Sequence, residues 1–419
     1  MVCGVRGRPP TLFWVLICCI ASTIFLLYIL GDRRAAVPAV VASMADIRLE
    51  LVTIIREELT KMETRVKYLE DDSLLKKKEY KTIAKISDKA YPKIKLLAQS
   101  EKKRILVTGG AGFVGSHLVD RLMVDGHEVT VIDNFFTGRK SNLEQWIGHE
   151  NFELRIHDIV TPMMIEVDEI YHLASPASPV KYMFNPIKTI KTNVVGTLNM
   201  LGLAKRVKAK LLLASTSEVY GDPKEHPQTE EYWGNVNPIG PRACYDEGKR
   251  LAETMVYAYA KQENVEVRVA RIFNTYGPKM HMFDGRVVSN FIIQALQGKP
   301  LTVSFPGNQT RSFMYVSDLV RGLILLMNSN YSLPVNLGNP DEHTILEFAQ
   351  IIQQELGVGT PITMIPSAQD DPRRRKPDIT KAKNFLNWHP TVPLRAGIRN
   401  TVKYFKTVLN DTEFFSHSS

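Results

Sequence analysis

The stretch Arg104-Ile-Leu-Val-Thr-Gly109-Gly110-Ala111-Gly112-Phe113-Val114-Gly115 predicts a buried strand that turns through glycines into a helix. Gly109 permits the tight turn, Gly112 lets the backbone approach a pyrophosphate, and Gly115 lets the helix pack closely on the strand. The N-terminus of that helix faces the phosphates with free N–H groups and the positive end of its dipole. The stretch therefore predicts a dinucleotide-binding unit.

Strands and helices alternate on both sides of this unit. The predicted strands are Ile105–Thr108, Val129–Ile132, Glu169–Leu173, Leu211–Ala214 and Val267–Ala270. Helical stretches between them include Ser116–Val124, Ile187–Val207 and Gly248–Lys261. The alternation predicts an α/β fold with a Rossmann-type, doubly wound parallel sheet. After about Gly277 the pattern becomes irregular, which predicts a smaller C-terminal lobe over the carboxyl edge of the sheet.

The second predicted strand ends in a carboxylate, Asp133, 18 residues after Gly115. A carboxylate at this place accepts hydrogen bonds from the adenosine ribose hydroxyls and repels a 2′-phosphate, so NAD is expected rather than NADP. Arg139 lies close enough to leave NADP open. The other interpretation of Asp133, a turn residue before Asn134, is disfavoured by the upstream glycines.

The composition fits a globular enzyme with appendages. The chain has 419 residues, of which 44% are hydrophobic and 23% are charged, enough for one large domain or two. Its net charge of +9 fits a solvated basic surface, a site for an anionic substrate or a membrane-facing stem. No basic patch interleaved with aromatics indicates nucleic acid. Cys244 stands alone in the body and is interpreted as a buried thiol, so no disulfide framework or metal cluster is expected.

The N-terminal part predicts a membrane anchor and a stem. Residues 1–10 form a short basic tail, and residues 11–30 carry no charge, which is about 20 residues and enough to cross ~30 Å of hydrocarbon as a helix. A retained type II anchor is expected, although the small residues of 35–42 leave signal cleavage open. The body would then be lumenal.

Residues 31–100 form the expected stem. An apolar seam spaced by three and four residues predicts either a short coiled coil or a lone amphipathic helix. The seam consists of Val52, Ile55, Leu59, Met62, Val66 and Leu69. Residues 101–408 are expected to form the catalytic domain, with 409–419 as a C-terminal tail.

Tyr245 and Lys249 stand one helical turn apart and predict an acid–base couple. The Lys249 ammonium is expected to favour the phenolate, lowering a pKa that is normally about 10. A phenolate beside a nicotinamide can take the proton of a sugar hydroxyl while a hydride leaves its carbon. An ordinary helical tyrosine with a lysine neighbour is the other interpretation, which the dinucleotide motif disfavours.

These motifs together resemble the extended short-chain dehydrogenase/reductase family of nucleotide-sugar enzymes. The resemblance covers residues 103–408 and is carried by Gly109–Gly115, Ser215–Gly221, Tyr245–Lys249 and Arg271–Pro278. The most similar branch acts on UDP-glucuronate, and its characteristic stretches here are Asn134–Gly138, His172–Pro179 and Asp371–Asp378. The resemblance implies a Rossmann domain with a smaller substrate lobe, bound NAD, and a homodimer or higher homo-oligomer in the Golgi membrane.

The triplet Thr216-Ser217-Glu218 selects among the family's reactions. Members that eliminate water have an acid at position 217, whereas a carboxylate beta to a C4 ketone leaves as CO₂ without one. The expected activity is NAD-dependent decarboxylation of UDP-glucuronate to UDP-xylose and CO₂ through a UDP-4-keto sugar, with internal regeneration of NAD. A UDP-sugar 4-epimerase remains open, although epimerases typically lack a carboxylate at position 218. So does a membrane-tethered NAD-binding scaffold.

The resemblance also implies individual roles. Thr216 would bond the C4 hydroxyl, while Ser217 and Glu218 would flank C5 and C6. Arg311 would anchor the carboxylate or donate a proton to C5, unless it forms a structural ion pair with Glu218. The implied cofactor residues are Gly109, Gly112, Phe113, Val114, Gly115, Asp133, Asn134, Phe136, Thr137, Gly138, Asp158, Ile159, Leu173, Ser175, Thr192, Ala214, Tyr245 and Lys249. The implied substrate residues are Lys191, Asn199, Asn274, Arg286, Arg311, Tyr315 and Arg375, of which Arg286 and Arg375 would clamp the diphosphate.

The loop Ser304-Phe-Pro-Gly-Asn308 departs from the Tyr-Gly-x-Gly-type stretch of the family and is expected to alter the contacts near the nucleotide. It creates a glycosylation sequon at Asn308, which we expect to stay unmodified because Arg311 is so near. Asn330 and Asn410 are the freer sequons.

Overall fold

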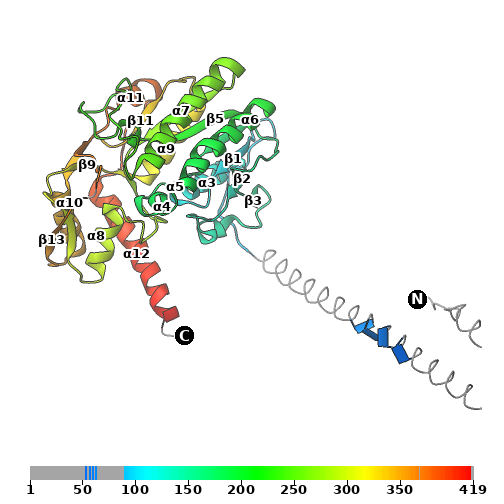
Figure 1. Cartoon of the computed structure of the whole chain (residues 1–419), viewed down its shortest axis with the longest axis horizontal. Coiled ribbons are helices and arrows are strands. Elements are labelled where there is room, and N and C mark those ends of the chain that lie inside the picture. Colours follow the sequence, from blue (N-terminus) through cyan, green and yellow to red (C-terminus); the bar gives the residue numbers. More distant parts are fainter. Residues whose placement is uncertain are drawn as a thin grey trace, which may run out of the picture. The chain divides into compact units, whose positions relative to one another are not determined.

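The computed structural model describes residues 89–367 and 369–416, together with 52–53, 56–57, 59–60 and 62–63 (Figure 1). The chain divides into two units, Met1–Lys89 and Ala90–Ser419. The predicted anchor lies outside the described residues, and none of the helices that are described is long and apolar enough to span a membrane. The stem residues described between 52 and 63 are helical, residues 89–100 are not, and Val52, Leu59 and Met62 are exposed. The coiled coil stays a prediction.

A seven-stranded sheet forms the centre of the larger unit, and its neighbouring strands all pair in parallel. The strand order is β11-β6-β5-β4-β1-β2-β3. The strands are β1 (Arg104–Thr108), β2 (Glu128–Asp133), β3 (Phe152–Ile156), β4 (Glu169–His172), β5 (Lys210–Thr216), β6 (Val267–Ile272) and β11 (Val335–Leu337). The order reverses at β1, where β2 and β4 flank it, so the carboxyl ends of β1 and β4 form a topological switch point. This confirms the predicted Rossmann-type sheet.

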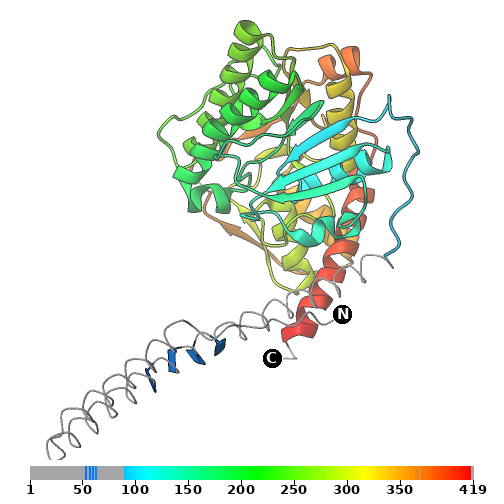
Figure 2. The ribbon, with the colours of Figure 1, turned by 90° about the vertical axis from the view of Figure 1, so that its right-hand side faces the viewer.

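Helices cover both faces of the sheet (Figure 2). Alternate residues of β1 enter different cores, because successive side chains of a strand point to opposite faces. Val107 packs in one core with α3 (Phe113–Val124) and α9 (Val316–Asn328). Leu106 packs in the other core with α6 (Thr197–Val207) and α7 (Ala243–Glu263). Burial on both faces explains the continuous apolar run of this strand.

The predicted helix Ile187–Val207 is interrupted. It consists of α5 (Pro186–Lys191), a π turn η2 (Thr192–Gly196) and α6. The Asn185 side chain accepts the N–H of Lys188 and so begins α5. The helix α7 begins five residues before the predicted Gly248, which places Tyr245 inside its first turn.

The C-terminal lobe has its own core, in which Phe291, Phe313 and Phe348 stack. Its elements are α8 (Val287–Leu296), β8 (Leu301–Ser304), α10 (Ile345–Leu356), β13 (Ile362–Ile365) and α12 (Leu394–Ser416). A small sheet of order β12-β9-β14 belongs to it, formed by Glu342–Thr344, Thr310–Ser312 and Arg374–Arg375. The lobe is not one continuous stretch, because α9, β11 and α11 (Thr380–Leu386) return to the main sheet.

The remaining short elements connect these parts. They are η1 (Lys140–Trp146), α4 (Pro179–Phe184), η3 (Ser217–Tyr220), β7 (Thr275–Tyr276) and β10 (Met314–Tyr315). Of these, α4 and η3 follow β4 and β5 directly and therefore lie at the carboxyl edge of the sheet.

Candidate active site

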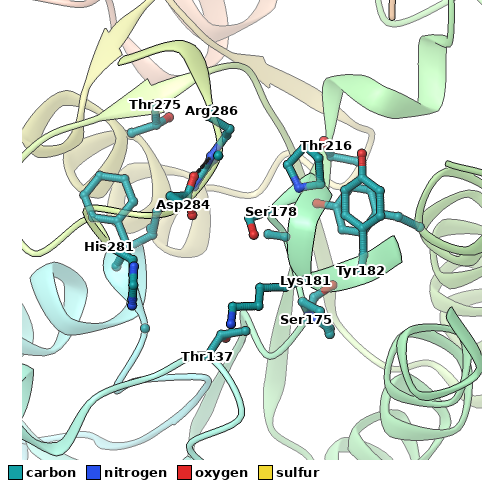
Figure 3. A pocket seen from close by; sticks show the side chains of 18 of the residues that line it. Thr137, Ser175, Ser178, Lys181, Tyr182, Thr216, Thr275, His281, Asp284 and Arg286 are labelled. Carbon is teal, nitrogen blue, oxygen red and sulfur yellow. Dashed lines mark hydrogen bonds and ion pairs between the residues drawn. The ribbon is translucent and has the colours of Figure 1, made fainter. Parts of the chain in front are cut away.

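A cavity of about 540 Å³ lies at the carboxyl edge of the sheet. It is lined both by the ends of β1, β2, β4 and β5 and by residues of the C-terminal lobe. Figure 3 shows Ser175, Ser178 and Tyr182 on the segment after β4, with Asp284 and Arg286 across from them. This is the position at which doubly wound sheets bind their ligands.

The glycine-rich turn has the geometry of a phosphate cradle. Gly109 has a φ of +71°, which favours glycine. A Cβ on Gly115 would lie 2.2 Å from the Gly109 carbonyl oxygen, so no other residue fits there. The helix α3 begins after Gly112 without a side-chain cap, which leaves its first N–H groups to bind an anion.

Asp133 ends β2 in a buried position. Its Oδ2 accepts the Ala111 N–H at 3.0 Å and its Oδ1 accepts the Phe135 N–H at 2.8 Å. Burial raises the pKa of this carboxyl, and the two N–H donors oppose the rise. Each oxygen retains a lone pair for a ribose hydroxyl. Gly138 lies behind the carboxylate, where a Cβ would approach Oδ2 to 2.8 Å. The cradle and the carboxylate thus fit NAD.

The other predicted cofactor residues line the same cavity, although they lie far apart in the sequence. Asp158 is fixed by Lys188 at 2.8 Å and by the Asn134 amide at 2.9 Å. The predicted residues that line the cavity are Gly109, Gly112, Phe113, Val114, Gly115, Asp133, Asn134, Phe136, Thr137, Asp158, Ile159, Leu173, Ser175, Thr192, Ala214, Tyr245 and Lys249.

Tyr245 is 6% exposed and stacks on Tyr182, with ring centroids 5.0 Å apart and planes at 11°. Its hydroxyl is hydrogen-bonded to that of Thr216. Burial, followed by the charge of Glu218, raises the pKa of Tyr245, and the charge of Arg286 opposes the rise. For the protein alone, the predicted lowering of this pKa is wrong. Burial is the main reason. Lys249 donates its Nζ to the Ala214 carbonyl at 2.8 Å, and this Nζ lies 5.9 Å from the Tyr245 ring centroid.

Glu218 is held by two arginines. Arg375 forms a bidentate pair with it, at 2.6 and 2.7 Å, and Arg242 donates to Oε2 at 2.5 Å. Burial opposes ionisation of Glu218, but the charges of Arg375 and Arg242 prevail and lower its pKa to about 2. Glu218 is therefore an anion, and it cannot serve as an acid near neutral pH.

The structure places Arg311 and Arg375 against two different carboxylates. Arg311 does not pair with Glu218, because its Nη2 binds Asp371 at 2.9 Å and its Nη1 donates to the Thr310 carbonyl. Strand β14 places Arg375 opposite Arg311 and against Glu218 instead. Arg375 thus lies at the triplet Thr216–Glu218, whereas a diphosphate clamp was expected of it. Both arginines line the cavity.

Arg286 and Asn274 also line the cavity, as predicted for substrate residues. Arg286 lies before α8 and pairs through Nε with Asp284 (Figure 3). Its guanidinium is close enough to Tyr245 for its charge to oppose the rise of the phenol's pKa. A cation here suits either a diphosphate or a phenolate.

Three predicted substrate residues do not line the cavity. Lys191 ends α5 with an exposed side chain. Asn199 donates its amide to the Ile159 carbonyl at 2.8 Å and so braces the segment after β3. Tyr315 packs its ring against Tyr276, with centroids 5.7 Å apart, below the C-terminal lobe. Lys191 thus faces solvent, and Asn199 and Tyr315 make contacts within the protein, so none of the three lines the cavity as predicted.

Comparison with known proteins fits this geometry. A model of the family described as GDP-mannose 4,6 dehydratase matches residues 106–401. The chain is 72% identical over 319 residues to UDP-glucuronic acid decarboxylase 1 of Xenopus tropicalis, with 76% of each chain covered. It is 61% identical over 308 residues to UDP-glucuronic acid decarboxylase 3 of Arabidopsis thaliana, which covers 73% of this chain and 90% of that one. The chain belongs to this family of extended short-chain dehydrogenases/reductases.

Solved members of the family share the fold. A UDP-glucuronic acid 4-epimerase of Bacillus cereus, in complex with UDP-glucuronic acid and NAD, aligns with a TM-score of 0.66 at 27% identity. The alignment covers 73% of this chain and 99% of the epimerase. A dTDP-glucose 4,6-dehydratase of Streptomyces venezuelae, solved with NAD, aligns with the same TM-score at 26% identity. The motif-based prediction of the family is confirmed.

Sequence reasoning missed several side chains of this nucleotide-sugar enzyme. Arg242 lies one helical turn before Tyr245, a spacing that could have revealed it. Ser178 lies within the stretch His172–Pro179 and Tyr182 follows it, and within the described structure their buried hydroxyls have no hydrogen-bond partner. Both line the cavity and are free to bind a polar ligand.

Proposed function

We propose that the chain catalyses the NAD-dependent decarboxylation of UDP-glucuronate to UDP-xylose and CO₂ through a UDP-4-keto sugar. The carrying observation is the triplet Thr216-Ser217-Glu218 inside the cavity, with Glu218 locked as an anion by two arginines. The triplet offers no acid for a departing hydroxyl, so the cavity favours loss of CO₂ over loss of water. The names of the relatives point to the same reaction.

Tyr245 is the general base in this proposal. The C4 hydroxyl gives its proton to the phenolate, with Thr216 holding the same hydrogen-bond network. Bound NAD supplies the hydride acceptor and donor. Because burial raises the pKa of Tyr245, the phenolate needs the nearby positive charges of Lys249 and Arg286.

The 4-ketone then serves as an electron sink. The C5–C6 bond breaks, its electron pair moves into the C4 carbonyl, and C6 leaves as CO₂. A proton taken up from solvent replaces C6 on C5. C4 takes back the hydride that the bound cofactor would hold, and the C4 oxygen regains the proton from Tyr245. The redox change is therefore zero over one turnover, and no added reductant is required.

The charge at the sugar end suits an anionic substrate. Arg242, Arg311 and Arg375 face two paired carboxylates, Glu218 and Asp371, with Arg242 3.8 Å from Asp371. A third carboxylate, Asp246, lies 3.9 Å from Arg242, but burial and the charge of Glu218 raise its pKa to about 7. Near neutral pH Asp246 is therefore only partly ionised, and the three cations outweigh the anions. A carboxylate of the sugar would be stabilised by this surplus, which a neutral hexose would not use.

Product analysis tests the proposal. The purified protein is incubated with UDP-glucuronate and NAD, and the masses of the nucleotide sugars are measured by mass spectrometry. We expect conversion to a UDP-pentose with release of CO₂. Recovery of unchanged substrate after complete saturation with NAD would contradict the proposal.

A 4-epimerase is the second candidate, since the epimerase of Bacillus cereus shares the fold and was solved with UDP-glucuronic acid. It would give a uronate of unchanged mass and altered stereochemistry. The same mass spectrum therefore separates the two reactions. The anionic Glu218 held by Arg375 favours the decarboxylase.

We further propose that two copies associate through α5, α6 and α7, which lie along one flank of the sheet (Figure 2). Each of these helices exposes aliphatic side chains: Ile187 and Ile190 of α5, Leu198 of α6 and Leu251 of α7. Exposed apolar area gathered over neighbouring helices is typical of a protein interface. A second copy would offer the same face, which suits a symmetric dimer.

The membrane topology is part of the proposal too. The uncharged run 11–30 and the short basic tail before it support a type II protein with its body in the Golgi lumen. Asn330 lies exposed in the loop after α9, where a glycan fits. Treatment of cell-derived protein with peptide N-glycosidase should lower its apparent mass, and Asn330→Gln should reduce that shift. Protein that stays unglycosylated and open to protease in sealed microsomes would contradict the lumenal placement.

A further inference from the structure

Glu253 is a buried carboxylate of α7 that the proposed reaction does not use. It lies one turn after Lys249 and two turns after Tyr245, so the three side chains share one face of the helix. Two strands of the sheet hold it. Arg271 of β6 donates from Nη2 at 2.8 Å, and the Ser215 hydroxyl of β5 donates at 2.5 Å. This carboxylate is therefore fixed in orientation, although it is not among the residues that line the cavity.

Lys249 needs a counterion. It is 4% exposed, and its Nζ donates to the uncharged Ala214 carbonyl at 2.8 Å. A buried ammonium without a nearby anion is costly and tends to lose its proton. Burial lowers the pKa of Lys249 to about 8, and the charge of Glu253 is what opposes the lowering.

The other groups around Lys249 do not provide this charge. From its own helix Tyr245 faces it as a neutral phenol, because burial raises the pKa of that hydroxyl. His172 of β4 also feels its charge, but burial lowers the pKa of His172 to about 3, so the ring is neutral. Arg271 of β6 is a cation that lies beyond Glu253. Glu253 and Lys249 are buried one turn apart on α7 and bind adjacent residues of β5, Ser215 and Ala214. Among the described residues, Glu253 is thus the carboxylate placed to act on Lys249.

We propose that Glu253 is a positioning residue that supplies the countercharge of the Lys249 ammonium, and that Arg271 and Ser215 fix it for this purpose. It acts through Lys249 and touches neither cofactor nor substrate. The inference rests on the proposed function, in which an ammonium beside Tyr245 favours the phenolate.

The test measures the protonation of Lys249 directly, without turnover. The side-chain resonance of Lys249, assigned by its loss in Lys249→Met, is followed against pH in the full chain labelled at lysine. In Glu253→Gln the titration midpoint should fall by about one pH unit, as expected for loss of one unit charge at this spacing. Glu253→Asp keeps the charge while shortening the side chain, and its midpoint should stay near that of the parent protein.

Arg271→Gln separates this role from a structural one. It breaks the same ion pair as Glu253→Gln but leaves the carboxylate, so the Lys249 midpoint should stay or rise. An unchanged midpoint in Glu253→Gln, or an equal fall in Arg271→Gln, would overturn the proposal. If Glu253→Gln does not fold, the double variant Glu253→Gln/Arg271→Met removes both charges together, and its midpoint should fall as well.

Turnover gives the second measurement. The alkaline limb of kcat/KM should move to lower pH in Glu253→Gln by the same amount as the resonance, and should not move in Glu253→Asp. If the parent protein itself does not decarboxylate UDP-glucuronate, the proposed function fails. The resonance titration still decides the role of Glu253 in that case.

Discussion

Ionisable side chains are unusually concentrated around Tyr245 and Glu218. Burial raises the pKa of Tyr245 and lowers the pKa of Lys249, so it favours the neutral form of both side chains. The pKa of Glu218, which is partly buried, is shifted toward the charged form, because Arg375 and Arg242 outweigh burial. The contrast assigns the proton-transfer work to Tyr245 and a purely electrostatic role to Glu218.

Tyr245→Phe should lower turnover of UDP-glucuronate by about 10²–10⁴-fold, since it removes the general base. NAD should remain bound, because the phosphate cradle at Gly109–Gly115 is untouched. Turnover and the NAD content of the purified protein are the two measurements. Cys244→Ala is the adjacent control, whose thiol makes only a 3.4 Å contact with the Tyr182 carbonyl, and it should leave turnover close to that of the parent. Full turnover in Tyr245→Phe would favour the scaffold interpretation.

Glu218→Gln should destabilise the fold in a pH-dependent way. It leaves two arginines without their anion, which costs about 3–5 kcal/mol of unfolding free energy near neutral pH. Folding lowers the pKa of Glu218 from 4.5 to about 2, so its stabilisation is present above 4.5 and is lost as the pH falls toward 2.

Denaturant unfolding of both proteins across this range measures the effect. The difference between parent and variant should shrink steadily below about pH 4.5. Glu263→Gln removes an exposed partner of Lys205 and should give a small difference that changes little with pH. A difference for Glu218→Gln that is constant with pH would show that the ion cluster does not set this part of the stability.

The sequence identified those site residues that a local motif carries. Tyr245, Lys249, Thr216 and Asp133 each stand at a fixed distance from a glycine, a strand end or one another. Arg375 meets Glu218 across 157 residues of chain, through the pairing of β14 with β9, and no spacing in the sequence indicates that contact. For this reason Arg375 was expected at the diphosphate, and an ion pair of Glu218 was considered only with Arg311, as an alternative to the expected role of that arginine at the sugar.

At the scale of elements, continuous apolar runs predicted their strands correctly, whereas short segments and segments that alternate with polar residues were missed. The five predicted strands all lie in the parallel sheet. The edge strand β3 reads Phe-Glu-Leu-Arg-Ile and was missed, because polar side chains interrupt it where it faces solvent. The strand β11 was missed because it has only three residues. Pairing with β2 and β6 makes these strands, and pairing is a tertiary effect.

The turn before α3 gives a prediction at this scale. Gly115→Ala puts a Cβ 2.2 Å from the Gly109 carbonyl, so the helix has to move away from the strand and the cradle opens. NAD binding should be lost or weakened at least about tenfold, because a steric misfit of this size costs more than about 1.4 kcal/mol of binding free energy. Calorimetric titration with NAD measures it.

Gly202→Ala is the matched control, in the middle of α6 with no atom within 4 Å of the added Cβ. It should bind NAD normally and raise the unfolding free energy by about 0.5–1 kcal/mol. Equal NAD affinity in Gly115→Ala and in the parent would refute the cradle.

At the scale of the whole molecule, the flank formed by α5, α6 and α7 carries the active-site helix on its inner side and exposed aliphatic side chains on its outer side. Leu198→Glu and Leu251→Arg place charges on that outer side, so each should convert the proposed dimer into a monomer. Sedimentation equilibrium of the soluble body or of the detergent-solubilised chain is the measurement. Ile156 of the edge strand β3 is an exposed aliphatic residue away from this flank. Ile156→Glu is therefore the control and should leave the molecular mass of the dimer unchanged. A dimer that survives both flank substitutions would place the contact on another surface.

The small sheet β12-β9-β14 ties two guanidiniums to one rigid support. Arg311 and Arg375 are register partners on neighbouring strands, so they move as a unit with the C-terminal lobe. The support therefore fixes the separation of the two guanidiniums from each other. A displacement of β14 from η3 would take the bidentate partner away from Glu218 and raise the pKa of that carboxyl, because Arg375 is the larger of the two charges that lower it.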